Sequence, residues 1–343
     1  MDGADPLEPA EFAALLAPWL GAGAPGGAVL AVSGGPDSIA LMGCAALLPP
    51  RVPVLVATVD HGLRAASQPE AEAVAAAAAR LGLAHRRLAW TGPKPATGLQ
   101  DAARDARYAL LADLAAEVGA ASILTAHTLD DQAETVLIRL CAGSGPAGLA
   151  GMAPARPLGG TTLARPFLDL SKARLVATCR ARGWEFVQDP SNRDPRFARA
   201  RMRALLPGLA AEGLTAGRLA RLATRLRRDG AALDLAAAEA GLRLRQEGPD
   251  RRGRTVLDGP GFLALPEAVA LRVLGREIAA VAGPGRLRLE RLETLLAGVR
   301  RALTEDVALR RTLGGALVTV AGPRLTLTTA PPRRDSGAVD PAG

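Results

Sequence analysis

Lysine, aromatic residues and cysteine are all scarce in this chain of 343 residues. Lys94 and Lys172 are its only lysines, so arginine carries almost all of the formal net charge of +8. Alanine, glycine and proline are abundant, which is typical of a biased genomic base composition. The positive charge therefore does not by itself indicate a nucleic-acid partner. Because aromatic residues make up only 3% of the chain, leucine, valine and alanine must build its cores.

The cysteines and the N-terminal segment argue against several classes of protein. Cys44, Cys141 and Cys179 lie far apart and form no C-x-x-C motif, so the sequence indicates no zinc site, iron–sulfur cluster or disulfide framework and fits a reducing compartment. A secretory signal is not expected, because acidic residues interrupt the N-terminal segment at Asp2, Asp5, Glu8 and Glu11. No run of about 18 uninterrupted apolar residues is present. We therefore expect a cytoplasmic protein without a membrane partner.

The first half of the sequence alternates between short apolar segments and helical segments. The apolar segments predict strands at Ala28–Val32, Val54–Val59, His85–Trp90 and Ser122–Ala126. The segments between them predict helices near 37–48, 68–81, 99–118 and 128–141. This alternation is typical of an α/β domain with a doubly wound parallel sheet. Ligands of such sheets bind beyond the carboxyl ends of the strands, so the polar residues that follow each strand should lie at one edge.

The second half of the sequence loses this alternation. A strand near 163–168 and a helix at 171–182 precede a segment that is read as purely helical after about residue 213, with helices at 214–228, 230–245, 265–282 and 287–301. A closing hairpin is expected at Leu317–Val320 and Leu325–Thr328. We therefore predict an N-terminal domain over 1–212 and a mainly helical second domain with the hairpin over 213–330. The first dozen residues and the tail over 331–343 are expected to be disordered.

A strand, a glycine turn and the start of a helix follow one another at Ser33-Gly34-Gly35-Pro36-Asp37-Ser38. Glycines reach positive φ and let backbone N–H groups face a phosphate, and the helix start adds its own N–H groups and the positive end of its dipole. Ser33 and Ser38 offer hydroxyls, and Asp37 offers a carboxylate for Mg²⁺. The spacing lacks the lysine of the P-loop and the G-x-G-x-x-G of dinucleotide sites. An anion site is predicted, with an ordinary capped turn as the alternative.

A second polar cluster follows the second expected strand. Asp60, His61 and Arg64 place an acid, an imidazole and a guanidinium within five residues. The ribose, adenine edge and phosphates of a nucleotide use such groups. The alternative is a polar turn in which Gly62 adopts positive φ.

The third cluster follows the fourth expected strand. His127, Asp131 and Glu134 recur at i, i+4 and i+7 and are expected to share one helical face. Thr128 can cap this helix, with Asp131 partly completing a capping box. Two acids on one face are costly unless a cation lies beside them, and the ligand count is short for a metal centre. We predict recognition of a positively charged substrate or Mg²⁺, with a well-capped surface helix as the alternative.

Arginine is concentrated between residues 191 and 228, where ten arginines stand against two acids. A helical face is expected to carry Arg218, Arg221, Arg225 and Arg228, and a separate apolar stripe Leu219, Leu222 and Leu226. This face is either solvated or a surface that follows the phosphates of a nucleic acid, whose binding would weaken steeply with salt.

A set of motifs together resembles the tRNA(Ile)-lysidine synthetase family. The segment SGGPDS is similar to the SGGxDS pyrophosphate loop of ATP pyrophosphatases, which release pyrophosphate and leave AMP on an acceptor oxygen. In the order of the family there follow DHGLR, HTLDDQAET, a glycine-rich loop that ends at Met152, and the segment Asp189-Pro190-Ser191-Asn192. The pieces Ala103-Arg104, Arg107-Tyr108 and Arg165-Pro166-Phe167-Leu168 are similar to the family as well. The resemblance covers about residues 28–207.

The resemblance implies a fold and a reaction. The fold is an adenine-nucleotide α-hydrolase-like Rossmann domain followed by a helical domain. ATP would adenylate the C2 oxygen of the wobble cytidine in the CAU anticodon of tRNA(Ile), with release of pyrophosphate. The ε-amine of free L-lysine would then displace AMP and leave lysidine, which pairs with A rather than G. ATP and Mg²⁺ are the implied cofactors, and a homodimer stays open as the assembly.

The resemblance also implies roles for individual residues. ATP and Mg²⁺ would be held by Ser33, Gly34, Gly35, Pro36, Asp37, Ser38, Asp60, His61 and Arg64, with Asp37 as the metal ligand. The catalytic residues would be Asp37, His127, Asp131 and Glu134, with Asp131 and Glu134 holding the lysine. The C-terminal domain would contact the tRNA, and the arginines expected to do so are Arg107, Arg139, Arg199, Arg201, Arg203, Arg221 and Arg225.

The sequence departs from the family pattern at two positions, and two other functions remain alternatives to lysidine synthesis. Ala200 replaces the asparagine usual in R-N-x-I-R, and Gln188 replaces a usual acid. One rival is a tRNA-thiolating enzyme of the same fold that delivers sulfur through Cys141 and Cys179, against which the missing C-x-x-C argues. The other is a non-catalytic RNA-binding protein that holds ATP as a structural ligand.

Overall fold

The chain divides into two compact units in a computed structural model. The described residues are 4–49, 51–62, 67–92, 94–95, 97–187, 194, 196, 198–247, 254–283, 285 and 287–331. One unit comprises Met1–Gly143 and Gly148–Thr224, and the other comprises Ser144–Ala147 and Arg225–Gly343. A domain boundary after residue 212 stays a prediction.

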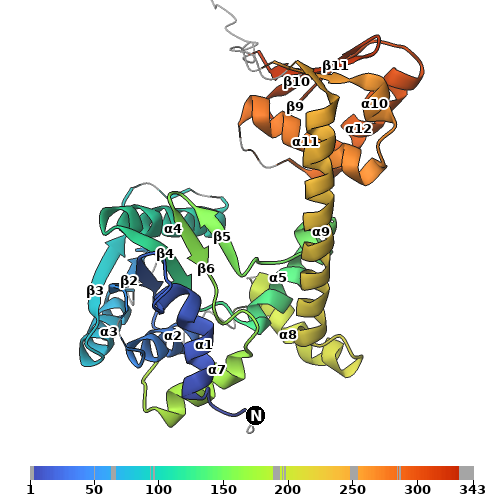
Figure 1. Ribbon diagram of the computed structural model, residues 1–343. Helices are drawn as coiled ribbons and strands as arrows, with labels where there is room; N and C mark the ends of the chain where they lie inside the picture. Colours follow the sequence, from blue (N-terminus) through green and yellow to red (C-terminus); the bar gives the residue numbers. More distant parts are fainter. Residues whose placement is uncertain are drawn as a thin grey trace, which may run out of the picture. The chain divides into compact units, whose positions relative to one another are not determined.

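The first unit is built on a six-stranded sheet in the order β3-β2-β1-β4-β6-β5 (Figure 1). Its strands are β1 (Gly27–Ala31), β2 (Val54–Asp60), β3 (Ala84–Ala89), β4 (Ala120–Thr125), β5 (Ala155–Leu158) and β6 (Thr161–Ala164). All neighbouring pairs are parallel except β5 with β6. Leu30 at the centre of β1 aligns with Val56 on one side and Leu124 on the other.

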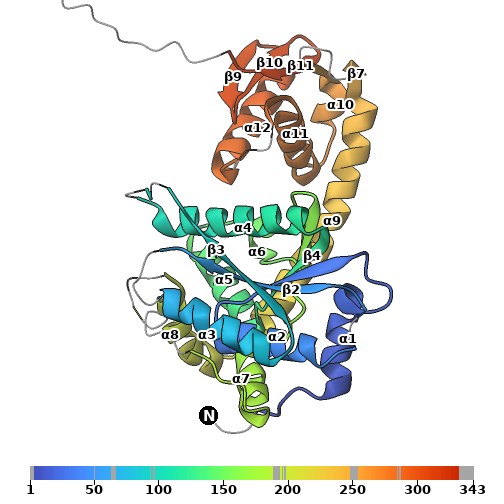
Figure 2. The same cartoon turned by 90° about the vertical axis from the view of Figure 1, so that its left-hand side faces the viewer.

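Helices cover both faces of this sheet (Figures 1 and 2). One face packs against α1 (Pro9–Leu20), α2 (Pro36–Ala46), α3 (Ser67–Arg80) and α7 (Lys172–Ala181), and the other against α4 (Leu99–Glu117). Successive residues of β1 supply the two cores in turn, because side chains alternate across a strand: Leu30 packs on the first face and Val29 on the second. The predicted doubly wound α/β fold is confirmed.

Disorder of the first dozen residues is a wrong prediction from residue 4 onward. Leu7, Phe12 and Leu16 are buried in the core of the first unit, and the Leu7 N–H donates a 2.8 Å hydrogen bond to Thr178 Oγ1. Burial of these apolar side chains offsets the entropy of ordering the segment.

A smaller helical layer completes the first unit. Its members are α5 (Leu129–Cys141), α8 (Ala198–Ala211) and the first part of α9 (Ala216–Leu244), and the short α6 (Pro146–Leu149) follows α5. Val136 and Leu137 of α5 pack with Leu219 and Ala223 of α9. The expected break between helices 214–228 and 230–245 is wrong, because α9 continues through Gly230. A glycine inside a helix costs only about 1 kcal/mol, which tertiary packing readily outweighs.

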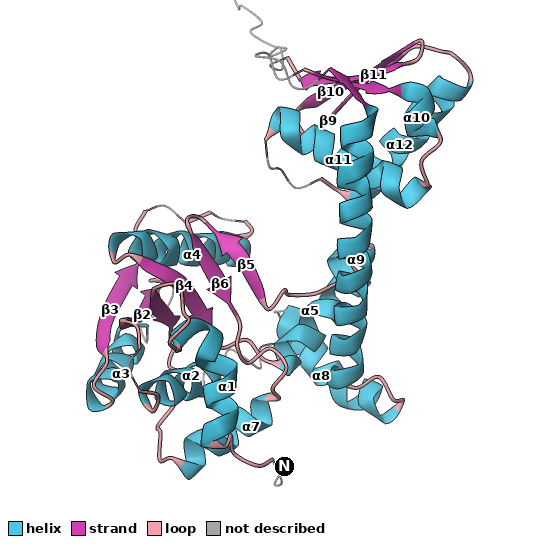
Figure 3. Cartoon of the chain, viewed as in Figure 1, coloured by secondary structure: helices cyan, strands magenta, loops and turns pink. Residues whose placement is uncertain are grey.

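The second unit combines helices with a separate antiparallel sheet (Figure 3). Its strands run in the order β7-β8-β11-β10-β9, and the expected hairpin forms from β10 (Ala316–Ala321) and β11 (Arg324–Thr329). The other elements are α10 (Gly259–Leu263), α11 (Glu267–Ala282), α12 (Leu289–Thr304), β7 (Arg245–Glu247), β8 (Thr255–Asp258) and β9 (Leu309–Leu313).

The expectation of a purely helical segment between residue 213 and the hairpin is wrong for β7, β8 and β9. These strands have three to five residues, which is too short for a clear alternation of polar and apolar positions. Their place in the sheet comes from pairing with the hairpin: β8 pairs with β11 and β9 pairs with β10. Among the described helices none is long and apolar enough to cross a membrane.

Candidate active site

The three polar clusters predicted from the sequence follow β1, β2 and β4, which are neighbours in the sheet. β1 is central, and both partners run parallel to it. Their carboxyl ends therefore meet at one edge, as Figure 2 lets the reader follow. The topology thus confirms that the clusters share an edge, which is where α/β sheets bind ligands.

The glycine turn after β1 has the geometry of an anion site. Gly34 adopts φ +85°, and its carbonyl accepts a 2.9 Å hydrogen bond from the Val187 N–H. Ser38 Oγ accepts the Ser33 N–H at 3.1 Å and donates to the Gly35 carbonyl at 3.0 Å, which closes the turn from within.

The helix that follows this turn starts without a capping side chain. Gly35 is the N-cap of α2 and Pro36 lies in its first turn, so no side chain at the N-cap satisfies the first N–H groups of the helix. This geometry supports a site for phosphate over the alternative of a turn capped by Asp37 or Ser38.

Asp37 lies in a mixed-charge environment. Lys172 Nζ, at the start of α7, lies 2.6 Å from Asp37 Oδ2, while Asp37 Oδ1 is buried without a hydrogen-bond partner among the described residues. Burial raises the pKa of Asp37 and outweighs the opposing effect of Lys172; Asp131 and Asp130 raise it further. Lys172 is not among the site residues predicted from the sequence, although its being one of only two lysines in an arginine-rich chain is a signal that points to it.

Asp37 fits a magnesium ion that is also held by phosphate oxygens. Within the described part of the chain no three His, Cys, Asp or Glu residues are arranged to hold a metal ion on their own. Mg²⁺ typically takes one or two carboxylates together with substrate phosphates and waters. The orphaned Oδ1 of Asp37 is an oxygen of the right kind beside the phosphate turn.

The cluster after β2 is partly a turn. Asp60 Oδ1 accepts the Gly62 N–H at 2.8 Å, and Gly62 adopts φ +59°, as the alternative reading of this segment predicted. His61 meets the Trp90 ring edge-on at 6.2 Å, its Nδ1 is buried without a partner among the described residues, and burial lowers its pKa. Arg64 lies outside the described residues, as do Gln188 and the segment 189–192.

The third cluster begins before its helix. Thr128 is the N-cap of α5 and forms a capping box with Asp131: the Thr128 N–H donates to Asp131 Oδ2 at 2.9 Å, and Thr128 Oγ1 accepts the Asp131 N–H. His127 precedes this cap, so the expectation that it shares a helical face with the two acids is wrong. Its Nδ1 instead lies 2.8 Å from Thr125 Oγ1. Because the cap already fixes Thr128, the helix cannot start one residue earlier.

Arginines of α8 face the two acids of α5. Arg203 Nη2 lies 2.7 Å from Glu134 Oε1, and Arg199 Nη1 lies 3.4 Å from Asp131 Oδ1 and 3.8 Å from Glu134 Oε2. Arg199 and Arg203 therefore supply some of the positive charge that these acids were expected to need from a ligand. Glu134 is fully buried, and its Oε2 still lacks a hydrogen bond among the described residues.

Ionisation at this cluster follows from burial. Burial lowers the pKa of His127 to about 3, so the ring is neutral near pH 7. Burial also raises the pKa of Glu134, against the effect of Arg203. For Asp131 burial is outweighed by the His127 ring, the Thr128 hydrogen bond and Arg199, and its pKa is lowered.

The remaining arginines expected at the site differ in their surroundings. Arg139 donates to the carbonyls of Gly148 and Gly151 at 2.7 and 2.9 Å, so it holds the glycine-rich loop. Arg107 lies within electrostatic reach of His61 and His127, and burial lowers its pKa. Arg201 donates to the Arg196 carbonyl at 3.0 Å.

The arginine face of α9 is exposed as expected. Arg221 and Arg225 are exposed, together with Arg218 and Arg228. The apolar stripe is only partly right: Leu219 is 1% exposed, but Leu222 is 42% exposed. Ala223 takes the buried position instead, because it lies four residues after Leu219 on the same face.

Gln132 is a second residue of this site that was not predicted from the sequence. Its side-chain Nε2 donates to the Met152 carbonyl at 2.9 Å, and its Oε1 accepts the Met152 N–H at 2.7 Å. Gln132 is buried, and in the sequence it lies between the two site acids Asp131 and Glu134. No pattern in the sequence distinguishes it from a surface residue of an amphipathic helix.

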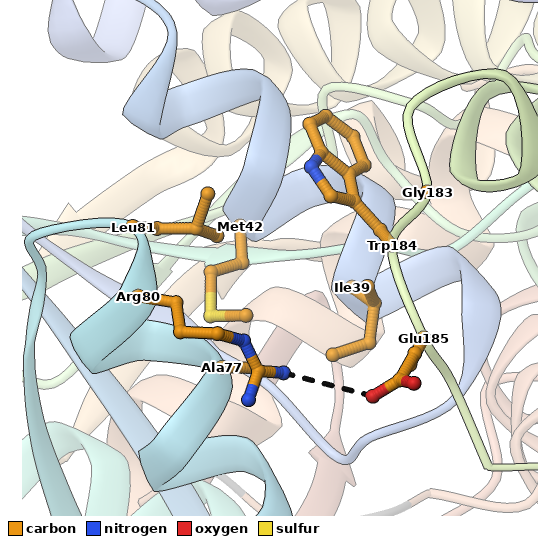
Figure 4. A pocket seen from close by; sticks show the side chains of 8 residues that line it. All are labelled: Ile39, Met42, Ala77, Arg80, Leu81, Gly183, Trp184 and Glu185. Carbon is orange, nitrogen blue, oxygen red and sulfur yellow. Dashed lines mark ion pairs between the residues drawn. The ribbon is translucent and has the colours of Figure 1, made fainter.

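A cavity of about 100 Å³ lies beside α2, the helix that follows the phosphate turn (Figure 4). It is lined by α2, α3 and the segment after α7, at Ile39, Met42, Ala77, Arg80, Leu81, Gly183, Trp184 and Glu185. Arg80 and Glu185 form a 3.8 Å ion pair at its side. None of the predicted site residues lines it, although Ile39 directly follows Ser38 of the phosphate turn.

The cysteines do not form the pair that a thiolating mechanism would use. Cys141 is exposed, whereas Cys44 and Cys179 are buried. Burial raises the pKa of both buried thiols to about 12, so neither carries a reactive thiolate near neutral pH. Cys179 Sγ donates to the Pro36 carbonyl instead.

The fold and the phosphate turn define a class, that of PP-loop proteins. A family model described as the PP-loop domain matches residues 11–209. The U34-tRNA thiolase NcsA from Methanococcus maripaludis superposes with a TM-score of 0.53 over 63% of this chain and 78% of that chain. Its sequence is only 15% identical, so this likeness shows the fold alone.

Relatives that match over nearly their full length narrow the class. The chain is 66% identical over 337 residues to the tRNA(Ile)-lysidine synthase of a Methylobacterium species, which covers 97% of this chain and 98% of the relative. It is 49% identical over 352 residues to the tRNA(Ile)-lysidine synthase of a Bradyrhizobium species, with 97% of each chain covered. The chain belongs to the tRNA(Ile)-lysidine synthase family.

Proposed function

We propose that this chain ligates lysine to C2 of the wobble cytidine in the CAU anticodon of tRNA(Ile), through an adenylated cytidine, with release of AMP and pyrophosphate. The observation that carries the proposal is the meeting of two sites at one sheet edge. The phosphate turn and Asp37 follow β1. We call Asp131, Glu134, Arg199 and Arg203 the acid–arginine cluster; its two acids lie on α5, which follows the adjacent strand β4, and its two arginines lie on α8. A nucleotide and an amino acid can thus be brought to the same base.

The turn Ser33–Ser38 would hold the phosphates of ATP through its backbone N–H groups and the start of α2. Asp37 would hold Mg²⁺, which supplies positive charge to the phosphates as pyrophosphate leaves. Lys172, 2.6 Å from Asp37, lies close enough to exchange that carboxylate for a phosphate oxygen. His61, half-buried after β2 and bearing an unpartnered Nδ1, would face the nucleoside.

The acid–arginine cluster suits a zwitterion better than a simple cation. Lysine carries an α-carboxylate as well as two amines, and here Asp131 and Glu134 stand beside Arg199 and Arg203. The carboxylate of lysine would pair with an arginine, and an ammonium with an acid. Lysine with both amines protonated has a net charge of +1, so the cluster would gain one positive charge on binding and lose it when the ε-ammonium gives up its proton.

The ε-ammonium must lose a proton before its nitrogen attacks C2, because its reference pKa is about 10.4. His127 is a weak base in this site, because burial lowers its pKa to about 3. Burial raises the pKa of Glu134, so Glu134 is the better acceptor of this proton. The new carbon–nitrogen bond then forms as the bond to the AMP oxygen breaks.

The decisive experiment is ATP-dependent transfer of labelled lysine to a CAU-bearing tRNA(Ile) transcript, with pyrophosphate release measured in parallel. A methionine tRNA transcript with the same anticodon is the control. Lysine on the isoleucine transcript alone supports the proposal. Pyrophosphate release without lysine transfer would favour another modification of the same base, and no pyrophosphate would favour a non-catalytic RNA-binding protein.

The sulfur-transfer rival has its own test. A Cys141→Ser, Cys179→Ser double variant should transfer lysine at the wild-type rate, because neither thiol has a part in the proposed reaction. We further propose a cytoplasmic location, where tRNA, ATP and free lysine are found together. A homodimer stays open as the assembly.

A further inference from the structure

Two arginines stack on the ring of Tyr108, a residue of α4 in the first unit. Arg104 of α4 and Arg156 of β5 place their guanidinium carbons 5.2 and 5.3 Å from the ring centroid. Tyr108 itself is buried in the core beneath α4. Arginines so held on an aromatic ring are pre-organised, because their planes are fixed while their outer N–H groups stay free to donate.

More arginines surround this pair. Arg165, which is 4% exposed, donates to the Ala153 carbonyl at 2.6 Å and hydrogen-bonds Tyr108. Arg139 holds the glycine-rich loop. Among the described residues none of these arginines, nor Arg107, makes an ion pair with a carboxylate. We call Arg104, Arg107, Arg139, Arg156 and Arg165 the Tyr108 cluster.

The members of the Tyr108 cluster repel one another. Arg104 lies within electrostatic reach of Arg107, Arg139 and Arg165, and burial together with these neighbours lowers the pKa of each of the three. Like charges gathered without acids are costly unless an anion joins them. The arrangement therefore fits a polyanionic ligand better than an empty surface.

The Tyr108 cluster leads to the candidate active site. Arg107 lies within electrostatic reach of His61 and His127, which follow β2 and β4. Arg104 is one helical turn earlier in α4, and Arg156 lies on β5 at the edge of the same sheet. Figures 1 and 2 show α4 along the face of the sheet, and Figure 1 shows β5 beside β6 at the sheet edge.

We propose that Arg104 and Arg156 bind successive backbone phosphates of the substrate RNA and guide the strand toward the site, an inference that rests on the proposed function. Arg139 and Arg165 are fixed by their bonds to backbone carbonyls and act as stationary charge. Arg156 gives one Nη1 bond to the Pro157 carbonyl at 3.2 Å, so among the described residues its other donors and those of Arg104 are left for a ligand. ATP has its own turn after β1. Guanidinium groups spaced along a surface match the repeated charges of a phosphodiester chain.

The test is binding of the CAU-bearing tRNA(Ile) transcript, without ATP or lysine, at several salt concentrations. The variants are Arg104→Gln, Arg156→Gln and their combination, which keep most of the side-chain length. Each single change should weaken binding about three- to tenfold and make the slope of log K against log salt shallower by about 1, as expected for one lost phosphate contact. ATP binding should stay unchanged.

Arg86→Gln is the matched control, because Arg86 is a half-exposed arginine of the same sheet whose charge is already paired with Glu117. Arg104→Lys and Arg156→Lys keep the charge and should retain the wild-type salt slope. Wild-type affinity and slope in the double glutamine variant, with wild-type thermal unfolding, would overturn the proposal. Competition by polyglutamate but not by RNA would also overturn it, in favour of an acidic protein partner.

Failure of the proposed function looks different. If the wild-type chain transfers no lysine yet binds the transcript with the expected loss in the glutamine variants, the RNA surface stands and the reaction does not. If lysine transfer succeeds and the variants bind RNA normally, the reaction stands and the RNA surface does not. Loss of ATP binding in the variants would move both arginines to the nucleotide site and contradict the inference.

Discussion

Two clusters of charged side chains in the first unit differ in whether their charges are paired. In the acid–arginine cluster every carboxylate has a cationic neighbour, with Arg203 2.7 Å from Glu134 and Arg199 3.4 Å from Asp131. In the Tyr108 cluster the arginines lie close to one another, and among the described residues none of them forms an ion pair with an acid. Balanced charge suits a small zwitterion that exchanges partners on binding, whereas unbalanced charge calls for a long anion. Charge balance, more than charge itself, separates the two sites.

The largest effect is expected at Asp37, whose carboxylate is part of the balanced region through Lys172. Asp37→Ala should slow pyrophosphate release by at least about a hundredfold, because the carboxylate proposed to hold Mg²⁺ beside the phosphates is lost. Pyrophosphate release with saturating tRNA and lysine measures this. Asp169→Ala, which removes an exposed acid of the same unit, should react as fast as the wild type. A fully active Asp37→Ala chain would remove Asp37 from the reaction.

A smaller and more selective effect is expected at Glu134. Glu134→Gln should slow the transfer step, because glutamine cannot accept the proton of the ε-ammonium. It should also raise the KM for lysine about tenfold and change the KM for ATP little, because one charge-assisted contact is lost. The same change removes the ion pair between Arg203 and the buried Glu134, so the free energy of unfolding should fall by about 1–2 kcal/mol. Glu117→Gln at the exposed pair with Arg86 should alter stability by no more than about 0.5 kcal/mol. Equal rises in both KM values would count against Glu134 as a lysine contact.

The protonation of His127 is expected to make the free energy of unfolding depend on pH. The unfolded chain protonates this ring near pH 6.5, but the folded chain keeps it neutral down to about 3. The unfolded state therefore binds the extra proton in this window, and stability falls as the pH drops from 6.5 toward 3. Asp131, whose folded pKa is lowered, acts in the same direction.

His127→Gln should remove part of that fall. Chemical unfolding of the wild type and the variant at several pH values gives the difference between them, in which the contributions of Asp37 and Glu134 largely cancel. Arg107, Arg165 and Arg199 also face the ring and disfavour its protonation. Parallel curves for the two chains between pH 3 and 6.5 would show that His127 titrates as in the unfolded chain.

The smallest effect is expected on α9. Arg221→Glu with Arg225→Glu should weaken tRNA binding a few-fold at low salt and hardly at all at high salt, since these arginines are exposed and screened. Comparison with the Arg104 and Arg156 variants ranks the two surfaces. If the α9 variant weakened tRNA binding more than the Arg104 and Arg156 variants did, the Tyr108 cluster would not be the main RNA-binding surface.

The sequence predicted the sheet and the edge that carries the site, because the strands of the first unit are buried and so read as apolar runs. It could not predict which cation meets Glu134. That answer depends on the packing of α8 against α5, which places Arg199 and Arg203 more than sixty residues away in the chain. Lys172 and Asp37 meet across an even longer separation. Short strands such as β8 were missed for a related reason: their partner β11 lies far along the chain.

Gln132 holds the backbone of Met152 from both sides, as donor and as acceptor. A side-chain amide offers both functions, whereas an ionised glutamate at this position could not donate to the Met152 carbonyl. Since Gln132 sits between Asp131 and Glu134, turning the helix to re-aim either acid would break both bonds together. The acids are consequently stationary, and an incoming amino acid must travel to them.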